Sequence, residues 1–471
     1  MVKKILKKSG FILLILLVLF GIARIMDKSL GGIYDGLRAP YLQLPTANSM
    51  VIRWQTKDRN VGVVRIGEVA GKLTKEISEL SADDEHRVQL TGLKANTRYY
   101  YSVGTQDYAL FKGSKYWFKT SPDTSPDIGT DNTSVQAVRF WVTGDQGAAG
   151  DIQNGVRDAM LSWTKQQPLV GKTTPDFWLT LGDNAYRSGS NKQFQTNFFT
   201  PYAPILKHTP VWPAYGNHDA RRWAFFNIFD LPTQAEAGGL GSSTEKYYSF
   251  DYGRLHVVML DSQSSRIQKN SKMLRWLKKD LAQTKQQWLV VAFHHPPYTK
   301  GSHNSDSLTD SFGRMRNVRK YVLPILENAG VDVVLAGHSH MYERSWFMNC
   351  HYGFSKTFSR QFIQDRAPQA DIDSGETRQQ QNNLVYRKAA TDLSAYSGTI
   401  YVTLGSSAKL DNGDLNHPAL PISLAASGSM IFDIVGNKLT VNFINELGQV
   451  VDSFSIEKGA VDAPVAREQC Q

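Results

Sequence analysis

Short segments of hydrophobic and polar residues in alternation dominate the first part of the chain, over residues 36–122. Residues 49–55 alternate along their length, and residues 61–66 do so more loosely. Two further segments of the same kind, 97–103 and 116–120, close this region. Regular short strands with turn residues between them predict an all-β sandwich domain over residues 36–122.

A different pattern follows residues 123–134, a stretch rich in Ser, Thr, Pro, Asp and Gly that is typical of a linker. Apolar residues at helical spacing predict a helix capped by Asp151, a second helix capped by Ser271, and a third over residues 317–328 that ends in a glycine cap. Apolar runs that read as strands lie between these helices. The alternation predicts an α/β domain over residues 135–460, with helices covering a sheet.

The last third of the chain is interrupted by a polar region at residues 349–397, which we expect to be an insertion on the surface. Strand patterns return at residues 399–404, 429–434 and 439–443. The C-terminal segments are therefore expected to complete the same domain.

The N-terminal segment, residues 1–26, is basic at first and then apolar, with an unbroken apolar run at residues 11–20. A basic flank and an apolar run too short for a typical spanning helix are the pattern of a secretory signal. We therefore expect export, to a secreted or periplasmic location or to the outer face of a membrane. The small-residue cleavage site is weak, so both cleavage and retention as a membrane anchor stay open.

Composition adds two constraints on this picture. A chain of 471 residues exceeds one typical core, in agreement with two domains. The net charge of +10 comes from lysines and arginines interleaved with acids, so no specific nucleic-acid partner is expected. Cys350 and Cys470 are the only cysteines, and an oxidising compartment would allow them to pair.

Five predicted strands of the second domain end directly before a side chain that can bind a metal ion. The residues at these ends are Asp145, Asp183, Asn217, His294 and His338. A glycine precedes four of them, which lets the backbone turn sharply and approach an ion closely. One Gly-Asp pair is usually a turn, but five such ends in one domain indicate a shared site at the carboxyl ends of the strands.

Tyr186 and His340 lie close behind two of these strand ends and extend the set of candidate ligands to seven. Carboxylate and imidazole ligands without cysteine suit Fe, Mn or Zn rather than a structural thiolate zinc site. Seven ligands exceed the need of one ion. Two ions about 3.5–4 Å apart, sharing one carboxylate, would use them all.

The order of the blocks Gly-Asp-Gln-Gly, Gly-Asp-Asn-Ala-Tyr, Gly-Asn-His-Asp, His-His-Pro-Pro-Tyr and Gly-His-Ser-His-Met-Tyr-Glu-Arg resembles the signature of the calcineurin-like metallophosphoesterases, and specifically of the purple acid phosphatases. The resemblance implies a metallophosphoesterase domain with a β-sandwich core flanked by helices, preceded by an all-β domain. The segment 93–101 also looks like a tyrosine corner, so the first domain resembles a fibronectin type III module with Trp54 as its core aromatic residue.

The resemblance assigns a role to each candidate ligand. It implies that a ferric ion is held by Asp145, Tyr186 and His340, that a divalent Fe, Zn or Mn ion is held by Asn217, His294 and His338, and that Asp183 bridges the two ions. His294 is chosen over His295 because the ligand of the family block stands two residues before Pro296.

Other histidines and acids of these blocks receive different roles. The resemblance implies that His218 binds phosphate and donates a proton to the leaving group, and that His303 is a second substrate histidine, although a solvated loop histidine is the alternative. His295 is expected to pack against a ligand or support it. Asp219 and Glu343 are expected to orient histidine ligands or to form a salt bridge inside the domain. Four histidines without a motif are expected to be structural: His208, His256, His351 and His417.

The activity expected from these residues is hydrolysis of phosphate monoesters by attack of metal-bound hydroxide, as in an acid phosphatase. The substrates would be small phosphate esters. Phosphodiesters or nucleotides are the alternative substrates, because the loops 299–313 and 349–397 that shape the pocket are not predictable. Two alternatives belong to another class. A secreted binding module with an inactive metal site is disfavoured because inactive relatives usually lose ligands and none is missing here, and a membrane-surface structural protein leaves the ligand set unexplained.

Overall fold

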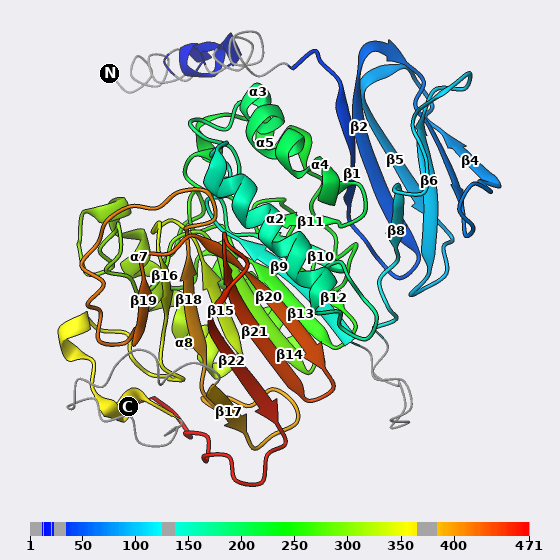
Figure 1. The fold of residues 1–471 in the computed structure, drawn as a ribbon. Helices are drawn as coiled ribbons and strands as arrows, with labels where there is room; N and C mark the ends of the chain where they lie inside the picture. The colour runs from blue at the N-terminus through cyan, green and yellow to red at the C-terminus, as the bar shows by residue number, and fades with distance from the viewer. Residues whose placement is uncertain are drawn as a thin grey trace.

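The computed structural model describes residues 34–124, 137–364 and 384–470, together with residues 12, 14–19, 21 and 22 (Figure 1). Most of the predicted signal or anchor segment 1–26, most of the predicted linker 123–134 and the middle of the polar region 349–397 lie outside these residues. Among the residues that the structure describes, no helix is long and apolar enough to cross a membrane.

The first domain is all-β, as predicted (Figure 1). One sheet has the strand order β1-β2-β5, and the other has the order β4-β3-β6-β7 with β8 paired to β6. The strands are β1 Arg38–Gln43, β2 Ser49–Asn60, β3 Val63–Gly67, β4 Lys75–Ser78, β5 Asp83–Thr91, β6 Arg98–Gly104, β7 Ala109–Phe111 and β8 Trp117–Lys119. Trp54 is fully buried in its core. The Tyr99 hydroxyl accepts a hydrogen bond from the Lys94 amide at 2.9 Å, the contact of a tyrosine corner.

Two seven-stranded sheets form the second domain. The first has the order β11-β10-β9-β20-β21-β22-β17 and the second β12-β13-β14-β15-β18-β16-β19. The strands of the first sheet are β9 Ala137–Thr143, β10 Phe177–Thr180, β11 Val211–Pro213, β17 Leu384–Lys388, β20 Gly428–Val435, β21 Lys438–Asn445 and β22 Val450–Lys458. Those of the second are β12 Tyr248–Tyr252, β13 Leu255–Met259, β14 Trp288–Phe293, β15 Val333–Ala336, β16 Tyr342–Arg344, β18 Ile400–Leu404 and β19 Ile422–Leu424.

The side chains of the central strands alternate between two cores. On β14, Val290 and Ala292 join the core between the two sheets, whereas Leu289, Val291 and Phe293 join a second core. The second core is completed by helical residues such as Leu277. A strand buried on both faces therefore reads as a continuous apolar run, and the domain is a β-sandwich flanked by helices.

Helices cover both outer faces of this sandwich (Figure 1). The longer helices are α2 Asp151–Gln166 and α6 Lys272–Gln283, and the shorter ones are α3 Asn191–Phe194, α4 Thr200–Leu206, α5 Ala224–Ile228, α7 Arg314–Asn317 and α8 Leu323–Asn328. The short π-helices η1 Gln195–Phe199 and η4 Val318–Val322 join α-helices, and the 3₁₀ helices are η2 Asp219–Arg221, η3 Asp310–Gly313, η5 Ser355–Thr357 and η6 Arg360–Phe362.

The helix starts differ in detail from the prediction. Gly150, not Asp151, occupies the N-cap of α2, so Asp151 is the first helical residue, where its charge favours the N-terminus. Ser271 does stand at the N-cap of α6, but its side chain makes no capping hydrogen bond. The third helix ends as predicted, with Gly330 at φ 76°.

The polar region 349–397 is not a surface insertion throughout. Asn349, Cys350 and His351 are buried, and β17 pairs in parallel with β22 at the edge of the first sheet. A disulfide joins Cys350 to Cys470 and ties the C-terminal tail to this region. The part of the region that follows Gln364 and precedes β17 lies outside the described residues.

Buried polar contacts fix the first domain against the second. The Tyr41 hydroxyl donates to the Ile228 carbonyl at 2.7 Å, and the Gln43 side-chain amide donates to the Val211 carbonyl at 3.0 Å. Arg38 is fully buried and donates to the side chain of Gln195 at 3.0 Å. Because buried polar groups are costly to leave unpaired, these contacts fix how the domains are placed.

Candidate metal centre

The candidate ligands lie where strands end and the backbone turns sharply. Strands β9, β10 and β11 are parallel neighbours, so their carboxyl ends share one edge of the first sheet. β14 and β15 are parallel neighbours in the second sheet. Three residues at these ends have left-handed backbone conformations: Asp145 at φ 56°, Asp183 at φ 53° and His338 at φ 70°. Such conformations are uncommon for residues other than glycine and persist where the surroundings enforce them.

The glycines beside these residues allow the strand ends to approach one another. A Cβ atom on Gly216 would lie 2.1 Å from the Asp183 amide nitrogen, and one on Gly337 would lie 2.6 Å from Asp145 Oδ2. Both distances are shorter than any side chain tolerates. The glycines of the motifs are therefore needed for close packing between segments as well as for local turns.

The first of two groups of ligand atoms surrounds the hydroxyl of Tyr186. This oxygen lies 2.9 Å from Asp145 Oδ1, 3.0 Å from Asp183 Oδ2 and 3.2 Å from His340 Nε2. Burial and the two carboxylates raise the pKa of Tyr186 well above its usual value. A tyrosinate at this position would therefore require a cation close to its oxygen.

The second group surrounds Nε2 of His294. This nitrogen lies 2.9 Å from Asn217 Oδ1, 3.2 Å from His338 Nδ1 and 3.5 Å from Asp183 Oδ1. Burial and the neighbouring histidines lower the pKa of His338 well below its usual value, so the ring is neutral and available as a ligand.

Asp183 reaches both groups, with one carboxylate oxygen near Tyr186 and the other near His294. The structure thus brings all seven predicted ligand residues together, in two sets that share one carboxylate. Nδ1 of His294 donates to the Leu181 carbonyl at 2.8 Å, so in the neutral ring Nε2 carries a lone pair. That lone pair faces the Asn217 oxygen and the Asp183 carboxylate. All three of these groups are electron-pair donors without a hydrogen atom between them. A cation placed among them would satisfy all three.

The outward atoms of the ligand rings are held by partners that the motifs do not contain. Nδ1 of His340 lies 2.5 Å from Asp411 Oδ2, and Nε2 of His338 lies 2.7 Å from Ser311 Oγ. Such partners orient metal-binding histidines. Asp411 and Ser311 stand far from these histidines in the sequence, and no spacing rule could have found them.

His218 and His303 lie beside the two groups without joining them. The His218 ring is 4.3 Å from the Tyr186 ring, its Nδ1 lies 2.7 Å from the Arg187 carbonyl, and its Nε2 lies 3.8 Å from Asp183 Oδ2. Burial lowers the pKa of His218. The His303 ring stacks on His338 at 3.9 Å, and its Nδ1 lies 2.9 Å from Asp310 Oδ1.

The remaining polar residues of the motifs lie behind the site. Nδ1 of His295 lies 2.9 Å from Ser262 Oγ, and its ring is 4.4 Å from that of His338. Asp219 accepts hydrogen bonds from the Asn184 amide and the Gly216 amide, both at 3.0 Å, and so holds two of the strand ends together. Burial and the charge of Asp183 raise the pKa of Asp219 to about 7.

Glu343 and the histidines without a motif make contacts of other kinds. Glu343 accepts from the Thr299 hydroxyl and from the Lys300 amide, and so anchors the start of the loop that carries His303. His256 is fully buried between two carboxylates, and His351 and His417 are buried near Tyr298. His208 stacks on Trp117 of the first domain at 5.1 Å.

Comparison with known proteins assigns both domains. Residues 38–120 match the purple acid phosphatase N-terminal domain, and residues 138–342 match the calcineurin-like phosphoesterase family. Purple acid phosphatase 22 of Arabidopsis thaliana is 29% identical over 64% of this chain and 66% of its own length. Purple acid phosphatase 15 of the same plant is 28% identical over 55% of this chain and 49% of its own length. The match thus spans about half to two thirds of these relatives.

Solved structures share the fold at low sequence identity. A purple acid phosphatase from yellow lupin seeds superposes with a TM-score of 0.64 at 16% identity, covering 92% of this chain and 78% of the lupin chain. PhoD superposes with a TM-score of 0.57 at 13% identity, covering 92% of this chain and 93% of its own. Both domains of the family are present in the same order, so the chain belongs to the calcineurin-like metallophosphoesterases, as a member of the purple acid phosphatase type with candidate His and Asp metal sites.

Proposed function

We propose that the protein hydrolyses phosphate monoesters as an acid phosphatase, with two metal ions as its cofactor. The observation that carries the proposal is the position of Asp183, whose two carboxylate oxygens face two separate groups of ligand atoms. A single shared carboxylate between two ligand sets is the arrangement of two-metal phosphatases.

The proposed ligands follow the two groups. A ferric ion is assigned to Asp145, Tyr186 and His340, a divalent Fe, Zn or Mn ion to Asn217, His294 and His338, and the bridging position to Asp183. When bound, such ions neutralise phosphoryl oxygens and lower the pKa of water enough to supply a nucleophile in acid. Asp411, Ser311 and the Leu181 carbonyl keep the imidazole nitrogens aimed inward.

His218 and His303 are the proposed substrate residues. His218 commits Nδ1 to the Arg187 carbonyl, which leaves Nε2 on the side of Asp183 to bind a phosphoryl oxygen and to protonate the leaving oxygen. Because burial lowers its pKa, the proton-donating form of His218 is populated only in acid. His303, held by Asp310, is proposed to contact the same substrate from the side of His338.

The test is turnover of p-nitrophenyl phosphate and of its bis-ester by the purified protein at acid pH, with metal content measured alongside. We expect the monoester to react faster, and His218→Ala to lose about 10²–10⁴-fold in kcat. His208→Gln, which changes a histidine at the domain junction, is the matched control and should keep its rate. Faster hydrolysis of the bis-ester would make the protein a phosphodiesterase, and hydrolysis of neither would support an inactive binding module.

Export is proposed from the N-terminal pattern of residues 1–26 and is supported by the disulfide between Cys350 and Cys470, a bond typical of oxidising compartments. The mass of the mature protein from cell fractions decides between a cleaved signal and a retained anchor. A full-length chain in the cytosolic fraction would contradict export.

A further inference from the structure

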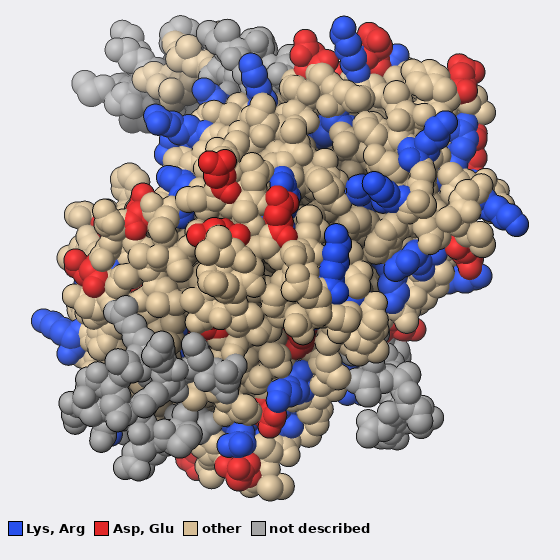
Figure 2. Space-filling view, in the orientation of Figure 1, with Lys and Arg blue, Asp and Glu red and all other residues tan. Residues whose placement is uncertain are grey.

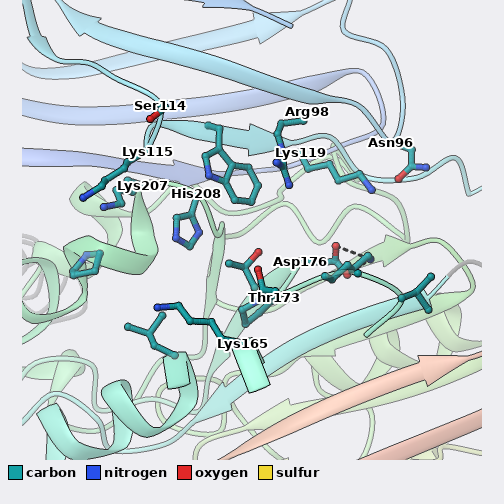
Figure 3. Close-up of a pocket in the computed structure, with 18 residues that line it drawn as sticks. Asn96, Arg98, Ser114, Lys115, Lys119, Lys165, Thr173, Asp176, Lys207 and His208 are labelled. Atoms are coloured by element: carbon teal, nitrogen blue, oxygen red, sulfur yellow. Dashed lines mark hydrogen bonds and ion pairs between the residues drawn. The ribbon is translucent and has the colours of Figure 1, made fainter. Parts of the chain in front are cut away.

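A cavity of about 840 Å³ lies between the two domains (Figure 3). Residues of the first domain, including Arg98 and Lys119, line one side, and Lys165 and Asp176 of the second domain line the other. Asp176 immediately precedes β10, whereas the proposed ligand Asp183 follows its other end. Extended chain rises about 3.3 Å per residue, so the seven residues from Asp176 to Asp183 span at most about 23 Å, with the length of β10 between the cavity and the metal centre.

The lining of this cavity is strongly basic. It includes six cationic side chains: Arg98, Lys115, Lys119, Lys165, Lys172 and Lys207. Asp176 is the one carboxylate of the lining, and it pairs with Lys172 at 2.6 Å. Within the described residues, the other five cations have no ion pair with a carboxylate. Figure 2 shows Lys and Arg side chains gathered where β8 and the C-terminal end of α2 meet in Figure 1.

Several of these cations lower the pKa of a neighbour, because bringing positive charges together disfavours the protonated form. Burial and the charge of Lys172 lower the pKa of Lys119, and burial and Lys115 lower that of Lys207. Burial and the charges of Lys207 and Arg98 lower the pKa of His208 to about 4, so this ring is neutral. Docking of the domains therefore brings together five positive charges, against which the described lining of the cavity sets only the Asp176 carboxylate, and an anion bound between them would relieve the repulsion.

The aromatic part of the lining argues against a nucleotide base as the occupant. The Trp117 ring lies 4.2 Å from the Arg98 guanidinium and stacks on the His208 ring at 5.1 Å with an interplanar angle of 10°. The Trp117 ring is therefore already stacked against Arg98 and His208 and is not free to stack on a base. The other lining groups include short polar side chains, Asn96, Ser114 and Thr173, which suit anionic oxygens rather than a base.

We propose that this cavity binds a compact polyanion with several phosphate or sulfate groups, held by Arg98, Lys115 and Lys119 of the first domain and by Lys165 and Lys207 of the second. Both domains contribute cations, so the ligand bridges them. By mass action, such a ligand stabilises the docked arrangement of the folded protein.

The test is calorimetric titration of the full chain with myo-inositol hexasulfate, a compact polyanion without a phosphate ester for the metal centre to hydrolyse. We expect binding that weakens with added salt. The double variant Lys119→Gln/Lys207→Gln should bind at least about tenfold more weakly, since it removes two of the five unpaired charges. The control Lys278→Gln/Lys279→Gln removes the same charge from the exposed side of α6 and should bind like wild type.

Three results would overturn the proposal: equal affinity in the two double variants, loss of binding when inorganic phosphate saturates the metal centre, or tighter binding of a single-stranded oligonucleotide. Should the first double variant unfold, Lys165→Gln, on the exposed end of α2, replaces it with a smaller expected loss. Hydrolysis of p-nitrophenyl phosphate should be the same in all these variants, because none of them changes the metal centre.

Discussion

At the scale of single residues, the proposed ferric site depends on Tyr186. Its hydroxyl lies between Asp145 and Asp183, and its pKa is raised, so the oxygen loses its proton only to a strongly attracting cation. We predict that Tyr186→Phe abolishes the visible charge-transfer absorption of the purified protein. Tyrosinate coordination of iron, the source of that absorption, requires the phenolic oxygen.

Tyr247→Phe is the control, because Tyr247 packs against Trp276 away from the metal centre. Iron content and the absorption spectrum are measured on both variants. Full colour and iron content in Tyr186→Phe would leave the protein in the wider metallophosphoesterase family without a ferric tyrosinate.

Asp411 positions the ring of the candidate ligand His340. Its carboxylate lies 2.5 Å from His340 Nδ1 and orients the ring whose Nε2 faces Tyr186. We predict that Asp411→Asn weakens metal binding about 10–100-fold, the usual effect of losing such a partner. Asp414→Asn, an exposed neighbour, should bind metal normally. Metal titration of both variants provides the measurement, and equal affinities would remove Asp411 from the site.

The motifs located the candidate ligands that converge in the structure because each follows a strand or its turn closely. Asp145, Asp183 and His338 are read directly from an apolar run that ends in glycine. Asp411 is 71 residues from His340, and its contact depends on how a loop after β18 folds back. No local pattern encodes that return, so the partners of the ligands became visible only in three dimensions.

At the scale of elements, His256 joins three of them. It lies on β13, with Nδ1 2.6 Å from Asp251 on β12 and Nε2 3.0 Å from Asp280 on α6. Burial disfavours its charged form, but the two carboxylates outweigh burial and raise the pKa of His256 to about 9. The stabilisation is therefore complete below pH about 6.5 and is lost as the pH rises through about 9.

We predict that His256→Gln lowers the free energy of unfolding by about 3 kcal/mol at pH 6, and that the difference from wild type shrinks above pH 9. Urea unfolding at pH 6 and at pH 9.5 measures both values. A difference that stays constant across this range would show that His256 contributes by packing alone.

The sequence predicts helices and strands where the pattern of apolar residues lies within the element itself. The helix over residues 317–328 was expected as one α-helix, but Pro324 cannot donate a hydrogen bond to the carbonyl four residues earlier, and a short π-helix, η4, precedes it. β17 was missed because five residues after a polar stretch carry little periodicity. It becomes a strand by pairing with β22, which lies far along the chain.

At the scale of the whole molecule, the disulfide closes the C-terminal part of the chain. Cys350 and Cys470 are 120 residues apart, and the Tyr352 hydroxyl lies 3.1 Å from Cys470 Sγ. A cross-link over so long a loop restricts the unfolded chain, an effect of about 5 kcal/mol in the chain-entropy model. We predict that Cys350→Ser/Cys470→Ser melts at a lower temperature than wild type. Reductant should lower the melting temperature of wild type and leave that of the double variant unchanged.

The contact between the domains has a consequence for aggregation. β11 stands at the end of its sheet, and strands in that position expose backbone groups that can pair with another molecule. Here Gln43 of β1 donates to the Val211 carbonyl of β11 from the neighbouring domain. The all-β domain thus shields an open sheet edge, and a metallophosphoesterase domain expressed without it would expose a template for intermolecular strand pairing.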